Sequence, residues 1–387
     1  MERLTAAIVE YLRKQKGEGQ QITVSPYFIS IETAAWSFPL IAFVAALPYA
    51  VYNYRRYGSV SLWRTVVLFS FAFYLQCAYY LVILPLPDPA EVAGYTTPQF
   101  DWMPFRFIFD LGETTFSITD PSTWLPVLKS MVVLEPLFNV LLTLPFGVYL
   151  AYYFEKDWKK CLLLSFFLSF FFEMTQLSGL YGIYPRPYRL FSTDDLMLNS
   201  LGGMIGYFAY SHLLRFLPQK EKLDQKSNQR SITVGFPRRI AAMLVDGFII
   251  GIIKNQVTSV YKIDGNPVYL TALLTTIYAI AFTLLTRGRT PGKALVRIKL
   301  VTCGEEQAFP LSVALRWLLR NTLLFAFSLL NMLVGRNDDW QLLWLALFVL
   351  LVLLSAADMV YSTRKNRRLW YERLSQTENI STFKVKT

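Results

Sequence analysis

Polar and charged side chains interrupt several long apolar stretches of the chain, and these residues are the best placed to carry out chemistry. The first group lies in the N-terminal half and consists of Glu135, Asn139, Glu173, Gln176, Arg186, Arg189, Asp194, Asp195 and Asn199. A guanidinium can bind a phosphate or a carboxylate through two hydrogen bonds, and acids can orient it. The first group therefore predicts a polar binding site at one end of the apolar segments.

The same residues also permit a purely structural interpretation. Asp194 and Asp195 precede an apolar segment that begins near residue 196, and acids are favoured at the positive N-terminus of a helix. Glu135 and Glu173 can form ion pairs with the two arginines of the group. A functional site and a structural network both remain open for the first group.

A second group lies in the C-terminal half and consists of Arg238, Arg239, Asp246, Arg316, Arg320 and Asp358. Each member lies near the same end of its apolar segment, so the aspartates can neutralise arginines of a neighbouring helix. An unpaired charge inside a membrane is costly and is a functional candidate by default. This inner charged layer is either a set of structural ion pairs or part of an ion or proton path.

Other kinds of chemistry find little support. The only histidine is His212, and the cysteines Cys77, Cys161 and Cys303 have neither a metal-binding spacing nor a C-x-x-C pair. The turn Thr290–Lys293 is too short for a phosphate-binding loop. We therefore expect no metal and no cofactor, no catalytic residue can be assigned, and an enzyme is the less favoured class.

Composition indicates where these residues lie. Of the 387 residues, 54% are hydrophobic and only 17% are charged, whereas a soluble domain has about 25% charged residues. The chain has too little charge to cover a water-facing surface, which excludes a disordered chain, a coiled coil and an ordinary cytosolic enzyme. The net charge of +11 follows from basic loops next to a membrane and indicates no nucleic acid partner.

A membrane span needs about 20 mainly apolar residues. Nine stretches qualify: 34–52, 65–86, 125–153, 161–181, 196–214, 240–258, 267–286, 311–334 and 340–361. We therefore predict an all-α, polytopic transmembrane helical bundle whose first partner is the lipid bilayer. Because Pro136 and Pro145 fall inside the third stretch, we expect it to be kinked or tilted.

The distribution of basic residues predicts the orientation of the bundle. Alternate loops and the tail 361–387 carry 25 Lys and Arg residues, and the opposite loops carry 5. Cytoplasmic loops are enriched in these residues, so we expect a plasma-membrane protein with a cytoplasmic C-terminus. Nine spans would then place the N-terminus outside, although residues 1–20 are themselves basic. The side of the N-terminus stays open.

Polarity along the chain predicts its division into domains. Residues 1–33 are predicted to form an amphipathic segment, and 34–217 a membrane module of five spans. Residues 218–236 are polar and are predicted to be a cytoplasmic linker. Residues 237–387 are predicted to form a second membrane module of four spans with a basic cytoplasmic tail.

The first module contains several short motifs that occur together in one known family. They are Met103–Arg106, Phe138–Asn139, Leu144–Gly147, Glu173–Gln176 and Ser192–Leu196, followed by Asn199, Gly202, Gly203 and Gly206. Through them, residues 60–215 resemble the VanZ-like family. The resemblance implies a role in reduced susceptibility to teicoplanin-type glycopeptides in Gram-positive bacteria, and it implies no established reaction.

The second module resembles the RDD family, which is named for one arginine and two aspartates. Arg238–Asp246 and Thr290–Lys293 carry the resemblance. The family usually has His-Asp before a threonine near its end, and Tyr371–Glu372 stands there in this chain. Asp358 and Glu372 therefore remain alternatives for the second aspartate. Some RDD members have been proposed to be cation/proton antiporters.

The favoured function is that of a cell-envelope factor linked to glycopeptide resistance. Its outward-facing polar site would engage an anionic lipid, a cell-wall precursor or a lipoglycopeptide. A cation/proton transporter that uses the intramembrane acids is one alternative. A membrane-embedded enzyme acting on a lipid-linked substrate, with Glu135 or Glu173 as general acid or base, is the other.

Overall fold

The structure is a computed structural model and is described here for residues 26–114, 117, 119–213, 231–261, 267–321, 338–364 and 367–383. The chain divides into two compact units. Unit 1 comprises Met1–Leu40 and Val67–Leu217, and unit 2 comprises Ile41–Val66 and Pro218–Thr387. The predicted amphipathic segment 1–33 and the predicted linker 218–236 lie mostly outside the described residues.

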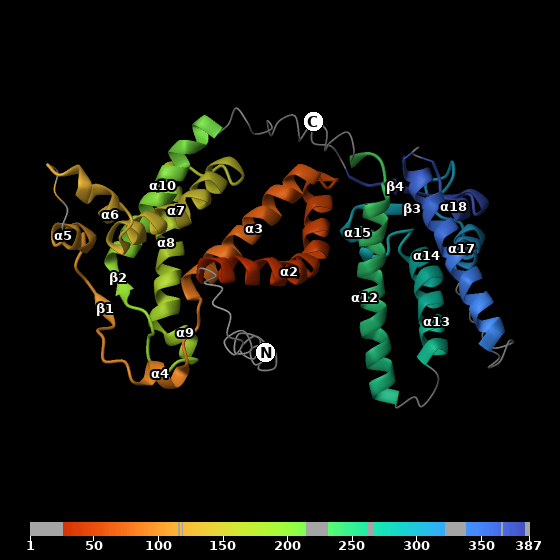
Figure 1. Cartoon of the computed structure of the whole chain (residues 1–387). Helices are drawn as coiled ribbons and strands as arrows, with labels where there is room; N and C mark the ends of the chain where they lie inside the picture. The colour runs from red at the N-terminus through yellow and green to blue at the C-terminus, as the bar shows by residue number, and fades with distance from the viewer. Residues whose placement is uncertain are drawn as a thin grey trace. The chain divides into compact units, whose positions relative to one another are not determined.

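Unit 1 is built from long helices joined by short helical turns (Figure 1). Its long helices are the N-terminal part of α2 (Pro26–Tyr57), most of α3 (Leu62–Ile83), α7 (Met131–Tyr152), α8 (Trp158–Leu177) and α10 (Thr193–Leu213). Its short elements are α4 (Pro89–Ala93), β1 (Phe100–Asp101), α5 (Arg106–Gly112), η1 (Pro121–Thr123), α6 (Trp124–Leu128), α9 (Gly179–Gly182) and β2 (Phe191–Ser192). Strands β1 and β2 pair in parallel.

Glycines bring α7 and α10 into direct backbone contact. A Cβ atom on Gly202 would lie 2.2 Å from the carbonyl oxygen of Val140, and one on Gly206 would lie 2.0 Å from that of Leu144. No side chain fits at these positions, so the Gly202–Gly206 pair acts as a small-residue packing surface between helices. This close approach places the polar side chains at the ends of the two helices next to one another.

Unit 2 contains the remaining helices and a two-stranded sheet (Figure 1). Its elements after the α2–α3 corner are α12 (Phe236–Tyr261), α13 (Pro267–Ile277), the π-helical turn η3 (Tyr278–Phe282), α14 (Thr283–Leu285), α15 (Pro291–Leu295), β3 (Ile298–Thr302), a helix that includes residues 310–321, α17 (Asp338–Arg364), α18 (Trp370–Leu374) and β4 (Thr377–Ser381). Strands β3 and β4 are antiparallel, with Ile298 opposite Ser381 and Thr302 opposite Thr377.

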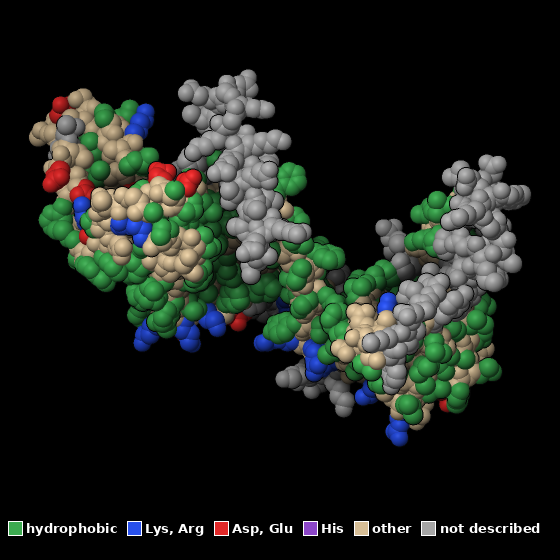
Figure 2. All heavy atoms as spheres, turned by 90° about the horizontal axis from the view of Figure 1, so that it is seen from below, with side chains coloured by type: hydrophobic (Ala, Val, Ile, Leu, Met, Phe, Trp, Pro, Cys, Tyr) green, Lys and Arg blue, Asp and Glu red, His purple; other side chains and the backbone are tan. Residues whose placement is uncertain are grey.

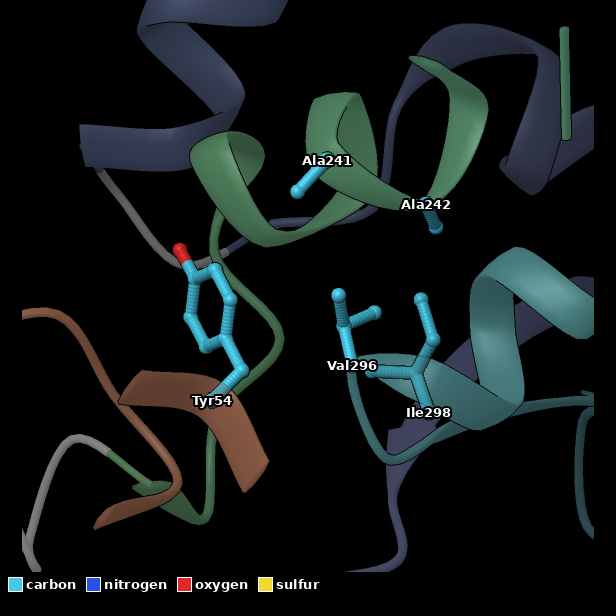
Figure 3. Packing of buried hydrophobic residues seen from close by; sticks show 5 residues of the cluster. All are labelled: Tyr54, Ala241, Ala242, Val296 and Ile298. Carbon is cyan, nitrogen blue, oxygen red and sulfur yellow. The ribbon is translucent and has the colours of Figure 1, made fainter. Parts of the chain in front are cut away.

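A small apolar core anchors the start of α12 to the start of β3. Tyr54, Ala241, Ala242, Val296 and Ile298 are all buried and pack together (Figure 3). The two alanines present a narrow helix face, so the chain just before β3 lies close to α12. This packing fixes the position of the charged residues at the same end of α12.

The helices have the length and surface of membrane segments. Five of those described are long and apolar enough to cross a membrane: Phe28–Tyr57, Leu62–Ile83, Met131–Tyr152, Trp158–Leu177 and Phe236–Val260. Large hydrophobic side chains are exposed on them, including Trp36 at 81% and Phe43 at 80%, and hydrophobic side chains cover much of the face seen in Figure 2. Exposed apolar area of this extent suits contact with lipid. The predicted all-α membrane bundle is confirmed, and the number of nine spans stays a prediction.

Candidate functional site

Polar side chains join α7, α8 and α10 at one end of unit 1. The amide Nδ2 of Asn139 donates to Oδ1 of Asp195 at 2.7 Å, and Nδ2 of Asn199 donates to Oγ of Ser169 at 3.0 Å. The hydroxyl of Thr143 donates to the carbonyl oxygen of Asn199 at 2.6 Å. Each hydrogen bond crosses between two helices, so Asn139, Asp195 and Asn199 of the first predicted group form a connected polar layer with Thr143 and Ser169.

Glu173 is the most deeply buried acid of this layer. Glu173 is only 2% exposed, and its Oε2 accepts a hydrogen bond from the backbone N–H of Ser192 at 2.9 Å. It interacts electrostatically with Asp195 and Arg189, and Asp195 interacts in turn with Glu135. Glu135 and Arg189 are exposed. Two partly or fully buried carboxylates thus lie beside one exposed acid and one exposed arginine.

Asp194 has a different role from its neighbour. Its two carboxylate oxygens accept the backbone N–H groups of Phe105 at 2.6 Å and Phe107 at 3.1 Å. These N–H groups belong to the first turn of α5, where helix donors lack partners inside the helix and where no local side chain caps them. Asp194 therefore caps α5 from a distant part of the chain.

Gln176 and Arg186 bind backbone carbonyl groups in earlier parts of unit 1, namely the end of α3 and the segment between α4 and β1. Gln176 Nε2 donates to the carbonyl oxygen of Val82 at 2.9 Å. A guanidinium nitrogen of Arg186 donates to the carbonyl oxygen of Thr97 at 2.6 Å. Both side chains satisfy backbone acceptors of unit 1, which is a positioning role rather than one in ligand contact.

Three buried polar atoms in or beside the layer have no hydrogen-bond partner among the described residues: Oδ1 of Asn199, Oγ of Ser165 and Nε of Arg186. The amide of Asn199 is 3% exposed and donates only to Ser169. A buried acceptor without a donor is costly, and such atoms are a feature of sites that accept a polar group. The layer therefore offers an unused acceptor beneath its carboxylates.

Sequence reasoning did not identify Ser169, although a signal was present. Ser165, Ser169 and Glu173 follow one another at a spacing of four on α8, which places them on one helix face. That face turns toward α10, because the hydroxyl of Ser169 also donates to the carbonyl oxygen of Asp195 at 3.1 Å. The polar stripe of α8 is thus the continuation of the layer into the bundle.

In unit 2, Asp246 binds neutral donors rather than an arginine. Its Oδ1 accepts from the hydroxyl of Tyr278 and from the backbone N–H of Gly292, each at 2.7 Å. Its Oδ2 accepts from the hydroxyl of Thr290 at 2.7 Å. A Cβ atom on Gly292 would lie 2.1 Å from the carbonyl oxygen of Ala242. Asp246 therefore anchors the Thr290–Lys293 turn against α12.

The partner of the arginines in unit 2 is Glu372. Its fully buried Oε1 lies 2.6 Å from Nη1 of Arg239 and 3.0 Å from Nη2 of Arg316. The same oxygen accepts from the amide of Asn379 at 3.0 Å, and Oε2 accepts from the backbone N–H of Leu369. Burial alone raises the pKa of Glu372, but the two arginines outweigh burial and hold this pKa below its ordinary value.

Asp358 and Arg238, two further members of the inner charged layer, have contacts other than Glu372. Asp358 lies 3.3 Å from a guanidinium nitrogen of Arg373 and accepts from the backbone N–H of Trp370, so it fixes the corner between α17 and α18. Arg238 is 1% exposed and donates to four acceptors, among them the carbonyl oxygens of Val296 and Arg297. Arg238 thereby connects α12 to the start of β3. Arg320, the last member, lies one helical turn after Arg316.

Within the described residues, no group of three or more His, Cys, Asp or Glu side chains could hold a metal ion.

The long apolar helices, together with polar residues held between them, define a polytopic helical membrane protein. Residues 71–215 match the family model VanZ/LLP1, and residues 233–372 match that of the RDD family. The predicted resemblances to these two families are confirmed, and the matched stretches are called here the VanZ-like segment and the RDD segment. No curated protein and no solved structure matches it.

Proposed function

We propose that the VanZ-like segment is a cell-envelope factor whose polar layer binds the head group of an amphiphilic envelope molecule at the outer surface of the plasma membrane. The observation that carries this proposal is the set of carboxylate and amide oxygens that hydrogen bonds within the protein do not fully use. Asp194, Gln176 and Arg186 are engaged with the backbone. Glu173 accepts from the backbone N–H of Ser192 and Asp195 accepts from the amide of Asn139, and Oδ1 of Asn199 has no partner among the described residues.

The ligand should carry both donors and an anionic group. Four acceptor groups converge in the layer, namely Glu135, Glu173, Asp195 and Oδ1 of Asn199. Arg189 alone supplies an exposed guanidinium to the same place. Carboxylates accept hydrogen bonds from hydroxyl or ammonium groups, and a guanidinium binds a carboxylate or phosphate. A cell-wall precursor or a lipoglycopeptide has this mixture, whereas a simple anionic lipid uses only the arginine.

The position of the polar layer at the ends of membrane helices favours an amphiphilic ligand. The layer lies at the ends of α7, α8 and α10, and apolar side chains such as Leu201 and Met174 are exposed along the same helices. A head group in the layer would leave an acyl chain beside these side chains. The excess of basic residues in the opposite loops favours an external position for this end. The resemblance to VanZ-like proteins then implies a link to teicoplanin susceptibility.

The test is complementation of a deletion strain with the full chain and its variants. Glu173→Gln keeps the shape of the side chain but loses its charge, and Arg189→Lys keeps the charge but loses the two-pronged geometry. We expect both variants to reach wild-type membrane levels and to leave teicoplanin susceptibility at the level of the deletion strain. Glu113→Gln, an exposed acid outside the layer, should complement fully.

Two outcomes would contradict the proposal. Normal abundance with wild-type susceptibility in both variants would remove the layer as a binding site. Low abundance of both variants would show that the layer is a structural network, as in the alternative interpretation of the sequence.

A further inference from the structure

Four basic side chains of unit 2 lie around the end of α12, and they are defined here as the basic cluster: Arg239, Lys293, Arg316 and Arg320. Lys293 reaches this place because its neighbour Gly292 is pressed onto α12, with its N–H bonded to Asp246. Arg239 lies on α12 itself. Two separate elements therefore bring positive charge to the same end of one helix.

A third element brings the other two cations. Arg316 and Arg320 are four residues apart in the helical segment 310–321, so they share one helix face. That face is turned toward α12, because Arg316 and Arg239 contact the same carboxylate oxygen of Glu372. Lys293 interacts electrostatically with both Arg316 and Arg320. The three elements thus form one cationic site.

The nearby acids offset only part of the positive charge of the cluster. Asp246 uses both oxygens on Tyr278, Thr290 and the backbone of Gly292. Glu372 is shared by Arg239 and Arg316. Four cations thus face two carboxylates, and in the described part of the chain no carboxylate forms an ion pair with Lys293 or Arg320.

Burial and the neighbouring cations together disfavour the charged form of Lys293. Burial, with a further contribution from Arg316, lowers the pKa of Lys293 to about 7, although Asp246 acts in the opposite direction. A bound anion would restore the charged form of this lysine, because opposite charges stabilise each other at close range.

We propose that the basic cluster binds the phosphate group of an anionic phospholipid at the cytoplasmic surface of the membrane. Leu315 is exposed next to Arg316 in the chain, and Met243 is exposed on α12 one helical turn after Arg239, so acyl chains have apolar surface next to the cations. Basic sites between membrane helices on the cytoplasmic side suit anionic head groups. The position of the cluster next to the most basic loops of the chain supports this side.

The experiment uses the purified full chain in a neutral detergent and measures its melting temperature. Phosphatidylglycerol at about one hundred times its Kd should raise the melting temperature by about 5 °C, and phosphatidylcholine should not. The double variant Lys293→Gln with Arg320→Gln should lose this shift. Lys299→Gln should keep it, because Lys299 is a basic residue of β3 that donates to Glu306 instead.

Inorganic phosphate provides the second arm. If phosphate alone stabilises the wild type as strongly as phosphatidylglycerol does, the ligand is a soluble anion and the lipid proposal is overturned. A shift that persists in the double variant also overturns it. If the double variant does not fold, Lys293→Met decides: without anionic lipid, the loss of one like charge should raise the melting temperature, and a fall would contradict the excess of positive charge.

Discussion

Glu372 should be the most sensitive ionisable residue of unit 2. Its carboxylate is fully buried and accepts hydrogen bonds from Arg239, Arg316, Asn379 and the backbone of Leu369. Glu372→Gln keeps the size of the side chain but leaves two guanidinium groups without a counter-charge. Removing one partner of a buried pair costs about 3–5 kcal/mol, so we expect the melting temperature in detergent to fall by about 6 °C or more.

Asp358→Asn is the matched control. Asp358 also pairs with an arginine, but its partner Arg373 is 54% exposed and the pair is 3.3 Å apart. Exposed pairs contribute about 0–1 kcal/mol, so the melting temperature should change by less than about 3 °C. Equal shifts in the two variants, or a Glu372→Gln protein that melts with the wild type, would refute this reasoning.

The pH dependence of the same comparison is also predicted. Because the pKa of Glu372 is lowered in the folded state, its contribution to stability is fully present above the ordinary carboxyl pKa and is lost as the pH falls through the folded value. The difference in melting temperature between wild type and Glu372→Gln should therefore be constant from about pH 6 to pH 8. It should shrink only in strongly acidic solution.

Three further predictions concern other contacts. Asp194→Ala leaves two backbone N–H groups at the start of α5 without acceptors and should lower the free energy of unfolding by about 1–2 kcal/mol. The loss should appear as faster proteolysis of the segment 87–124, and an unchanged cleavage rate would contradict the capping role. Gly206→Ala brings a Cβ atom to 2.0 Å from a backbone oxygen of α7, so it should lower the free energy of unfolding by about 1–3 kcal/mol or more. Gly247→Ala is the control: no atom lies within 4 Å of the added Cβ, so this variant should be as stable as the wild type or more stable. Burial, with Arg316 and Arg320 acting in the same direction and Asp246 and Glu372 against it, lowers the folded pKa of Lys293 to about 7. Wild type should therefore gain melting temperature relative to Lys293→Met as the pH rises from 7 to 9 in lipid-free detergent. A flat difference would contradict the lowered pKa.

Helical spacing in the sequence is sufficient to place residues of one helix on a common face. Asn139 and Thr143 are four residues apart, and both face α10 as that spacing requires. The separate roles of Asp194 and Asp195 could not be predicted, because they depend on which distant segment approaches each carboxylate. Asp194 meets the first turn of α5, about 90 residues earlier in the chain, whereas Asp195 meets α7.

The partners in unit 2 show the same limit. Depth along the predicted spans placed Asp246 and Asp358 beside arginines of neighbouring helices, but Asp246 bonds to the hydroxyls of Tyr278 and Thr290. The arginines instead meet Glu372, which follows the last span and carries no signal of depth. The close contact of Gly292 with α12 decides the partners of Asp246, and the short helix α18 brings Glu372 to the arginines. Neither feature has a periodic pattern in the sequence.

The most direct test of an outward-facing site is the labelling of Leu190→Cys in intact cells with a membrane-impermeant thiol reagent. Leu190 is exposed and follows Arg189 in the chain, while Lys299→Cys in the predicted cytoplasmic loop is the control. We predict that Leu190→Cys is labelled in intact cells, that teicoplanin or a lipid-linked cell-wall precursor slows its labelling, and that Lys299→Cys reacts only after permeabilisation. Labelling of Leu190→Cys only in permeabilised cells, or at a rate that no envelope molecule alters, would contradict the proposed site.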